Sequence, residues 1–441
     1  MTDAATDRGW WRRTFVSLGV RNYRLFFSGQ LISNSGNWLT IVAITLLVLH
    51  RTHSGAAVGL LSACMFGPLL VLSPFAGVVA DRSDKRKLLY VTQSGEMAQS
   101  IVLAVLAFVP ASPLWTFFVV AFGGGCLLAF DNPARRSFVS EMVPPPLVPN
   151  AVTLYSALVN LSRLVGPTLA AALIVAVGYG WCFAIDAASY IAVLAALVLM
   201  RPGELREVAR TPRGRGQVRE GLRYVRDEPV LRVTFLMLLV VGVFSYNFTV
   251  VMPLFVERGL HGSDAQFSLI YATFSAGAVI GTLTIARRSM VRLRTTIASA
   301  AALGAAMTVM TFVPSIATAF PAAAVVGGTS VAYMTTTTAL AQLEADERMV
   351  GRVLALQTVL LIGTTPIGGP LLGLLADSVG GRAPMLVGGL GALAAAALGV
   401  ALGRRRLAAG GRATHLSDAR PVTTAVSTPD DLRDVEDAQP I

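Results

Sequence analysis

The chain has 441 residues, of which 54% are hydrophobic and only 14% are charged, and its formal net charge is +11. Ordinary soluble domains have about 25% charged residues, so the composition argues against a soluble domain and indicates a membrane protein. The three cysteines lie in apolar stretches without the spacing of metal ligands, which argues against a disulfide framework and predicts no metal or other cofactor. The polar start of the chain lacks the cleavage pattern of a signal peptide.

Apolar stretches recur along most of the chain. About 20 apolar residues are needed to cross a hydrocarbon core of about 30 Å. This template predicts an all-α membrane protein with about twelve spanning helices. The expected spans are residues 26–49, 56–80, 88–109, 114–131, 151–177, 181–200, 231–256, 266–286, 293–313, 316–341, 351–376 and 384–403.

The spans fall into two groups separated by polar sequence. We expect an N-terminal segment (1–22), a first six-helix half (23–200), an arginine-rich central loop (201–230), a second half (231–403) and a tail (404–441). The tail is polar and rich in Ala, Thr and Asp, so we expect it to be disordered. The fifth and eleventh spans each contain a Gly-Pro pair, Gly166-Pro167 and Gly369-Pro370, which indicates that the halves are pseudo-repeats.

The basic residues predict the orientation. If the N-terminus is placed inside, all but four of the 36 Lys and Arg residues lie in inner segments; the exceptions are Arg51, Arg163, Arg258 and Arg382. Cytoplasmic loops of membrane proteins are enriched in Lys and Arg. The pattern therefore predicts a multi-pass protein of the cell membrane with both termini in the cytoplasm. The distribution also explains the net positive charge, because the basic residues lie in loops beside the lipid bilayer. A nucleic-acid partner is therefore not expected.

The polar stretch between the second and third spans reads GVVADRSDKRK and begins at Gly77. It resembles the G-x-x-x-D-R-x-x-R-R loop of the major facilitator superfamily, and the matching residues are Gly77, Asp81, Arg82, Lys85 and Arg86. Asp84 stands where many members have glycine. The resemblance implies the twelve-helix major facilitator fold and a gating role for this loop. An anchor that follows the positive-inside rule, without a gating role, is the alternative.

A second motif follows the fourth span, in the sequence DNPARRSFVSEMVPPPLVPNA and the RLVGP sequence of the fifth span. It resembles the exporter branch that contains the enterobactin exporter and the macrolide efflux proteins, and the matching residues are Asp131, Pro133, Arg135, Asn150, Ala151, Arg163, Gly166 and Pro167. The resemblance implies that Asp131 and Arg135 belong to the inner gate, with Asp131 joining Arg82 or Arg86. A Gly-Pro motif in helix 5 is associated with antiporters, although a helix kink that seats a neighbouring helix also explains it.

Charged residues inside spans are costly and are therefore candidates for function. Glu96, Asp131 and Asp186 are the acids within spans or at their ends, and we take them as candidates for proton coupling. In the resembled fold the third and sixth helices are peripheral. The alternative for Glu96 and Asp186 is therefore a structural role, as a partner of Arg163 or in a hydrogen bond to a neighbouring helix. Arg163 lies near the middle of the fifth span and needs an acceptor, for which Glu96 is the expected acid and backbone carbonyls are the alternative.

The resembled fold lines its central cavity with helices 1, 4, 7 and 10. The candidate cavity residues are Asn34, Asn37, Trp38, Tyr246, Asn247 and Tyr333. These side chains predict a neutral, amphipathic lining that suits a bulky, lipophilic solute better than a sugar phosphate, which would need Arg or Lys. Packing between helices is the alternative for the small polar residues of these spans.

The sequence lacks a GxxxxGK[ST] loop, an HExxH motif and a Ser/His/Asp set, which argues against an ATP-driven pump and against a membrane enzyme. We therefore expect a monomeric secondary transporter that exports a small amphipathic molecule, such as a siderophore, a macrolide or another drug-like compound, in exchange for protons. A lysophospholipid transporter or an importer of the same fold is the alternative. A membrane protein that transports nothing is the alternative from another class.

Overall fold

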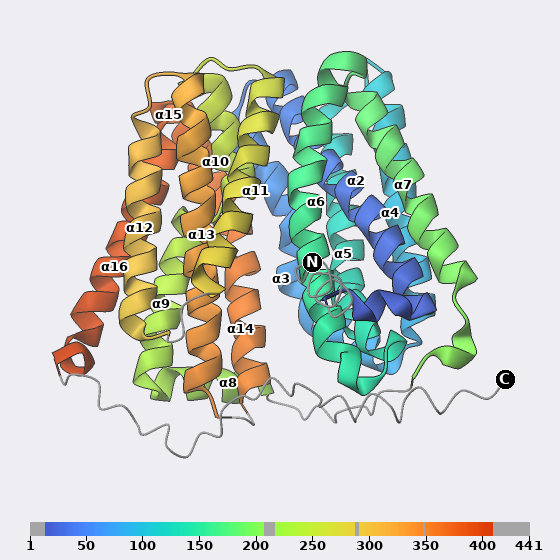
Figure 1. The fold of residues 1–441 in the computed structure, drawn as a ribbon. Coiled ribbons are helices and arrows are strands. Elements are labelled where there is room, and N and C mark those ends of the chain that lie inside the picture. The colour runs from blue at the N-terminus through green and yellow to red at the C-terminus, as the bar shows by residue number, and fades with distance from the viewer. Residues whose placement is uncertain (1–13, 207–216, 287–290, 347–348, 409–441) are drawn as a thin grey trace, which may run out of the picture.

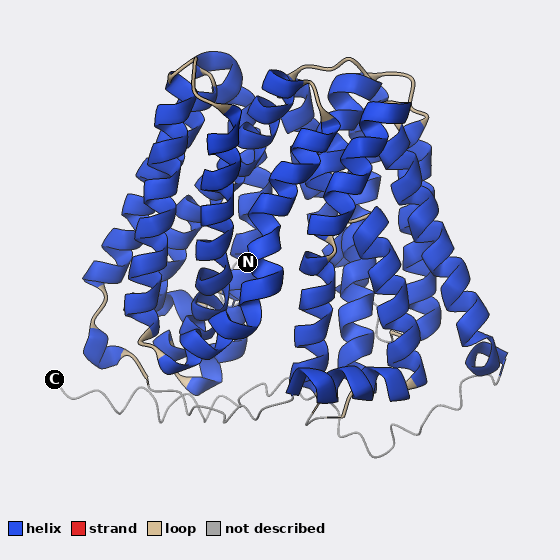
Figure 2. Cartoon of the chain, turned by 180° about the vertical axis from the view of Figure 1, so that it is seen from behind, coloured by secondary structure: helices blue, strands red, loops and turns tan. Residues whose placement is uncertain are grey.

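The computed structural model of the chain describes residues 14–206, 217–286, 291–346 and 349–408. Within these ranges every regular element is a helix, and the long helices stand side by side (Figure 1, Figure 2). The expected tail lies outside the described residues from residue 409 onward, as does part of the N-terminal segment and of the central loop.

Six long helices form the first half of the molecule, drawn in blue to green in Figure 1. They are α2 (Arg21–Thr52), α3 (Gly55–Arg82), α4 (Lys85–Phe108), α5 (Leu114–Met142), α6 (Val148–Val177) and α7 (Tyr179–Leu199). Within this half α2 packs on α6 and α7, and α4 packs on α5 and α7. Two of these helices have a side-chain N-cap. Ser54 caps α3 by accepting a hydrogen bond from the Ala57 amide, and Asp84 caps α4 by accepting one from the Lys87 amide.

The second half, drawn in yellow-green to red, begins after a short surface helix, α8 (Gln217–Asp227). Its other helices are α9 (Pro229–Phe244), α10 (Phe248–Leu254), α11 (Asp264–Ala286), α12 (Leu293–Thr311), α13 (Ile316–Glu344), α14 (Val350–Gly363), α15 (Thr365–Val379) and α16 (Ala383–Ala408). Helix α12 packs on α13 and α16, and α11 packs on α13. The most extensive contacts between the halves are those of α3 with α15 and of α6 with α11; α3 also contacts α10 and α14, and α2 contacts α10.

Eleven segments among the described residues are long and apolar enough to cross a membrane. Two of them, Pro229–Gly259 and Val350–Val379, combine consecutive helices that are interrupted near their middle. The expected eighth span, 266–286, corresponds to α11, which has 23 residues and is not among the eleven. The structure therefore confirms an all-helical protein with many membrane spans.

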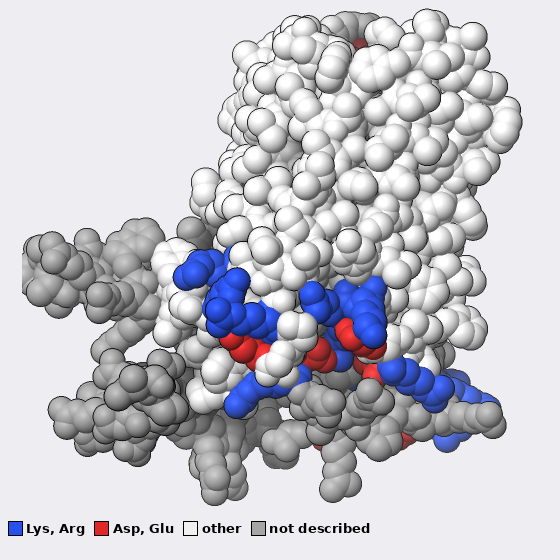
Figure 3. All heavy atoms as spheres, turned by 90° about the vertical axis from the view of Figure 1, so that its right-hand side faces the viewer, with Lys and Arg blue, Asp and Glu red and all other residues white. Residues whose placement is uncertain are grey.

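The two ends of the helix bundle differ in charge. Lys and Arg side chains gather at one end of the face shown in Figure 3, and we call this the basic end; it carries Arg82, Lys85, Arg86 and Arg201. The opposite end, which we call the far end, carries His53, Arg258 and Asp377. This separation of charge is the pattern that the positive-inside rule produces.

Candidate functional site

The loop between α3 and α4 lies at the basic end, where its charged residues hold the ends of neighbouring helices. Lys85 forms an ion pair with Glu141 in the last turn of α5. The Arg86 guanidinium donates to the carbonyl oxygens of Leu197 and Val198, at 2.7 and 3.3 Å, and so caps the C-terminus of α7. In this conformation Lys85 and Arg86 therefore connect helices of the first half with one another.

Asp131 and Arg135 form a buried ion pair on α5, which has no contact with Arg82 or Arg86. The Asp131 side chain is fully buried and also accepts hydrogen bonds from Thr92 and Gln93, at 2.9 and 2.8 Å. The expectation that Asp131 joins Arg82 or Arg86 is thus wrong for this conformation, because Asp131 faces α4 inside the first half. Arg86 instead reaches the end of α7.

The polar network around this ion pair extends to α2. Arg135 donates to the side-chain oxygens of Gln30 and Asn34, at 3.1 and 2.8 Å, and Gln93 donates to Glu96 at 3.2 Å. The network ties α2, α4 and α5 together in the interior of the first half. Asn34, expected in the substrate cavity, is a member of this network, and Asn37 donates to the Tyr190 hydroxyl of α7 at 3.4 Å.

Asp186 lies where α2, α4 and α7 meet. Its carboxylate accepts hydrogen bonds from the hydroxyls of Thr40 and Ser100, both at 2.7 Å, and its side chain is buried. A Cβ on Gly36 would collide with this carboxylate and with Ser189, so α2 and α7 approach closely there. Asp186 and Glu96 are therefore buried acids inside the first half, held by neutral donors.

Arg163 and Glu96 do not pair, which overturns the expected partner of Arg163. The Arg163 guanidinium instead lies over the ring of Trp38, with its central carbon 5.1 Å from the ring centroid, and its side chain is exposed. No acidic side chain among the described residues forms an ion pair with it. The expectation failed because depth along the helix axis does not say which way a side chain faces: Glu96 points into the first half, whereas Arg163 points toward the second.

Aromatic side chains from both halves meet beside Arg163. The Trp38 ring lies 6.4 Å from that of Tyr271, and ring contacts continue through Phe274 and Phe248 to Tyr246. Tyr246 lies 6.5 Å from Tyr333, which is fully buried. Of the expected cavity residues, the structure thus brings Trp38, Tyr246 and Tyr333 together. Tyr271 and Phe274 of α11 were not among the expected cavity residues, because the eighth span is not one of helices 1, 4, 7 and 10. Phe248 belongs to the seventh span and was not among them either.

The aromatic cluster lies beside a break in the seventh span. Helix α9 ends at Phe244 and α10 begins at Phe248. Asn247, another expected cavity residue, is buried and donates to the carbonyl oxygens of Gly242 and Val243, at 3.2 and 2.7 Å. Its side chain therefore caps the end of α9. Discontinuous helices near the middle of the membrane are a common feature of transporter binding sites.

The eleventh span is interrupted beside the same break. Helix α14 ends at Gly363 and α15 begins at Thr365. A Cβ on Gly242 would lie 2.5 Å from the Thr364 hydroxyl, so the two interruptions are in direct contact. The two broken spans thus touch at the points where their helical hydrogen bonding is interrupted.

At the far end, Asp377 of α15 joins the two halves. Its carboxylate accepts from the backbone amides of Gly55 and Ala56, at 2.6 and 2.9 Å, and from the Ser54 hydroxyl at 2.9 Å. These groups form the N-terminus of α3, where a negative charge is favourable. Arg258 donates to Asp377 at 2.6 Å and also to the carbonyl oxygen of His53. We call Asp377, Arg258 and the segment 53–56 the far-end latch.

Close packing of α3 and α15 continues from the latch toward the middle of the molecule. A Cβ on Gly59 would lie 2.5 Å from the Gly369 carbonyl oxygen and 2.6 Å from the Cα of Pro370. The expected Gly369-Pro370 pair thus packs against the other half. In contrast, Gly166 of the Gly166-Pro167 pair packs within its own half, where a Cβ would lie 2.7 Å from the Ser35 carbonyl oxygen. Pro167 lies inside the continuous helix α6.

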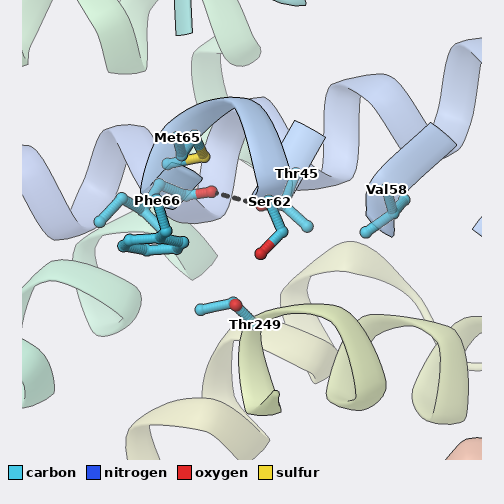
Figure 4. Close-up of a pocket in the computed structure, with 7 residues that line it drawn as sticks. Thr45, Val58, Ser62, Met65, Phe66 and Thr249 are labelled. Atoms are coloured by element: carbon cyan, nitrogen blue, oxygen red, sulfur yellow. Dashed lines mark hydrogen bonds between the residues drawn. The ribbon is translucent and has the colours of Figure 1, made fainter. Parts of the chain in front are cut away.

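The small void in Figure 4 shows how tightly the halves meet below the latch. Its volume is about 10 Å³, roughly the space of one water molecule, and Ser62 of α3 faces Thr249 of α10 across it. Its other lining residues are Ile41, Thr45, Val58, Met65 and Phe66. Tyr179 of α7 and Asp264 at the start of α11 add a hydrogen bond between the halves at this end.

Toward the basic end the same helices part. Contacts between α3 and the second half extend as far as Leu70, which lies 2.5 Å from the position of a Cβ on Gly363 at the end of α14. Nothing lies within 4 Å of the position that a Cβ on Gly351, at the start of α14, would occupy. Figure 1 shows the two halves leaning together at the far end and spreading toward the basic end. The contacts that join the halves among the described residues therefore gather at the far end and become fewer toward the basic end.

Two helical halves that close against each other at one end and part at the other define a transporter of the major facilitator type. The model of the transmembrane secretion effector family matches residues 13–427, and the chain belongs to this family. This confirms the resemblance to major facilitator exporters that the two loop motifs indicated.

Several known transporters are similar to this chain. The multidrug efflux pump Tap of Mycolicibacterium fortuitum is 27% identical over 87% of this chain and 96% of Tap. Macrolide efflux protein A of Streptococcus pyogenes is 25% identical over 81% of this chain and 91% of that protein. The staphyloferrin A transporter of Staphylococcus aureus is 25% identical over 59% of this chain, and the match spans 66% of that relative's length.

A solved structure supports the fold. The bacterial homologue of the human lysosomal transporter Spinster, in its inward-facing and unoccupied conformation, has a TM-score of 0.68 at 15% sequence identity. The match covers 88% of this chain and 98% of the solved one. At this level of identity the likeness shows the fold alone.

Proposed function

We propose that this protein is a secondary active exporter of small amphipathic molecules that works by alternating access. The observation that carries the proposal is the contrast between the latched far end and the parted basic end, because it is one of the two states that alternating access requires. The relatives named for macrolide efflux, multidrug efflux and staphyloferrin A transport support solutes of the drug-like or siderophore class.

The proposal includes twelve spans in two six-helix repeats, with α11 as the eighth span, in a monomer. Both termini and the basic end face the cytoplasm, in agreement with the distribution of Lys and Arg. The structure then corresponds to the inward-open conformation, ready to take up solute from the cytoplasm or from the inner leaflet.

Gating at the cytoplasmic side belongs to the opposite conformation. When the basic end closes, Asp81 approaches the N-terminus of α14 near Gly351, where the helix dipole favours an acid. Arg82, which follows Asp81 at the end of α3, takes part in the same gate. Asp81→Asn is therefore expected to insert normally and to lose most transport, measured as flux per inserted molecule. Flux at the wild-type level would show that this loop is only an anchor.

Export is coupled to protons through buried acids of the first half. Glu96, Asp131 and Asp186 are held by neutral donors or by a single arginine, so loss of a charge at any of them changes contacts between helices. The test is uptake of a radiolabelled macrolide into inside-out proteoliposomes with an imposed pH gradient. We expect uphill uptake that an uncoupler abolishes.

The acids are tested separately by neutral variants in the same vesicles. The variants are Glu96→Gln, Asp131→Asn and Asp186→Asn. The variant that neutralises the coupling residue should lose uphill uptake but keep downhill exchange. If uphill uptake persists in the triple variant, these acids do not couple transport to protons. Transport of a labelled lysophospholipid in place of the macrolide would favour a lipid transporter.

A further inference from the structure

The Arg163 guanidinium has contacts on its face but none at its edge. Trp38 covers one face at 5.1 Å, and the residue lies near the middle of the 30-residue helix α6. A guanidinium carries its N–H donors in the plane of the group, so a ring below it leaves these donors free. Among the described residues, no side chain or carbonyl accepts a hydrogen bond from them.

The acids of the first half cannot serve as the missing acceptor. Asp131 is paired with Arg135, and Asp186 accepts from Thr40 and Ser100. Glu96 is buried beside Gln93. All of these acids face the interior of the first half, so Arg163 contributes a positive charge, without a matching negative one, to the space between the halves.

Arg163 belongs to a polar stripe on α6. Ser156, Asn160 and Arg163 are all exposed and follow one another at helical spacing, so they share one face of the helix. The stripe is continuous with the aromatic cluster, because Trp38 contacts both Arg163 and Tyr271 of the other half. A polar face on a membrane helix is favourable only where water or a polar ligand reaches it. This face therefore looks into the space that opens toward the basic end.

We propose that Arg163 and the aromatic ring of Trp38, which packs on the buried ring of Tyr271, form a binding site for anionic aromatic solutes. A carboxylate or sulfonate accepts hydrogen bonds from the edge of the Arg163 guanidinium, and the flat apolar body packs against the partly exposed Trp38 ring. The inference deepens the proposed function by naming the class of substrate, and its binding part is testable without transport.

The depth of Arg163 distinguishes a solute from a lipid headgroup. Arg163 lies 15 residues after Val148, which corresponds to about 22 Å along the helix. Phosphate headgroups lie at the membrane surface, outside a hydrocarbon core of about 30 Å. The anion is therefore the charged group of a solute that enters between the halves.

The test compares two probes of the same shape, one anionic and one neutral. 2-Naphthoate and the neutral 2-naphthamide are titrated against the full-length protein in phosphatidylcholine nanodiscs, and binding is followed by calorimetry. The wild type should prefer naphthoate by about tenfold or more, as expected for hydrogen bonds to a charged group. Arg163→Gln should lose this preference, and Arg163→Lys should keep part of it, because lysine retains the charge but lacks the planar edge.

Two further variants separate charge recognition from general damage. Arg51→Gln is the matched control, because Arg51 also lies 5.1 Å over a ring, that of Phe117, but at the far end; it should keep the preference for naphthoate. Trp38→Leu should weaken both probes about equally. Addition of phosphatidylglycerol should leave the affinity for naphthoate within about twofold.

Equal binding of the two probes to the wild type, or an unchanged preference in Arg163→Gln, would overturn the inference. Loss of naphthoate binding on adding phosphatidylglycerol would assign the arginine to lipid instead. If Arg163→Gln does not fold, the comparison of wild type, Arg163→Lys and Arg51→Gln decides the question. Preference for the anion without any flux would contradict the proposed export and leave the binding site standing.

Discussion

Single residues divide into those that hold one half together and those that hold the two halves against each other. Arg135 and Asp131 belong to the first kind, since both are buried and bound to neighbouring helices of one half. Asp377 belongs to the second kind, since its carboxylate is contacted by both halves. Substitutions of the two kinds should therefore be distinguishable, because the first affects stability and the second affects the balance of conformations.

Asp131→Asn leaves Arg135 as a buried charge without its partner. Removal of one member of a buried ion pair typically costs about 3–5 kcal/mol. We expect a clearly lower midpoint of thermal unfolding for the purified protein, measured by intrinsic fluorescence. The double variant Asp131→Asn/Arg135→Gln should regain part of the loss, because it removes the unpaired charge. A double variant less stable than either single variant would contradict this account.

Asp377→Asn weakens several charge-assisted hydrogen bonds that exist only when the far end is closed. Each such bond is worth about 1.5–3 kcal/mol, so the closed conformation should become at least tenfold less populated relative to the open one. A cysteine at Thr249, which lines the small void below the latch, reports this change through its reaction with an impermeant maleimide added at the far side. The native cysteines are replaced beforehand.

The expected result is faster labelling of Thr249→Cys in Asp377→Asn than in the parent. The control is Glu204→Gln, which removes an exposed ion pair with Arg201 at the basic end and should leave the rate unchanged. Equal rates in Asp377→Asn and the parent would show that the latch does not set the closed state.

At the scale of elements, the contact of α3 with α15 depends on glycine. The backbones of the two helices approach so closely at Gly59 that no side chain fits between them. This seam lies between the halves and should separate when the far end opens. Helix α3 is continuous at Gly59, so its backbone does not require a glycine there. The glycine is needed only for the close approach to α15.

Gly59→Ala should therefore shift the protein toward the conformation that is open at the far end. Spin labels on cysteines at Leu60 and Leu374, two exposed positions on α3 and α15, measure the separation by pulsed electron resonance. We expect a new population at longer distance. Gly123→Ala is the matched control, because nothing lies within 4 Å of its Cβ position. A shift of the same size in the control would show that alanine acts through helix propensity.

At the scale of the whole molecule, the separation of charge between the two ends predicts the orientation in the cell. Cysteines at Gly203, at the basic end, and His261, at the far end, both occupy exposed positions. In a background without native cysteines, an impermeant maleimide should label His261→Cys in intact cells and Gly203→Cys only after permeabilisation. The reverse pattern would place the basic end outside and contradict export.

The sequence predicted the helices well because length and apolar character decide whether a segment spans a membrane. Helix α4, for example, occupies 85–108, against an expected span of 88–109. Pairings of side chains were harder to predict. Arg163 and Glu96 have similar depths, but they face opposite directions, and the rotation of a helix about its axis was not clear from an apolar stretch.

The far-end latch was missed for a different reason. Asp377 lies near the end of an apolar stretch, and Arg258 was noted only as an exception to the distribution of basic residues. Their contact joins positions 119 residues apart in the chain. The signal that could have revealed it is an acid and an arginine at the same expected end of two spans, one in the seventh and one in the eleventh.

The latch has a consequence for the two faces of the membrane. A solute at the basic end meets molecules that are already open to it, whereas a solute at the far end can bind only the fraction whose latch is broken. Its apparent dissociation constant on that side equals the intrinsic value divided by this fraction. If the latch favours closure about a hundredfold, binding from the far side is about a hundredfold weaker. The hydrogen bonds around Asp377 thus disfavour the rebinding of released solute from the far side, although they do not change the residues that bind the solute.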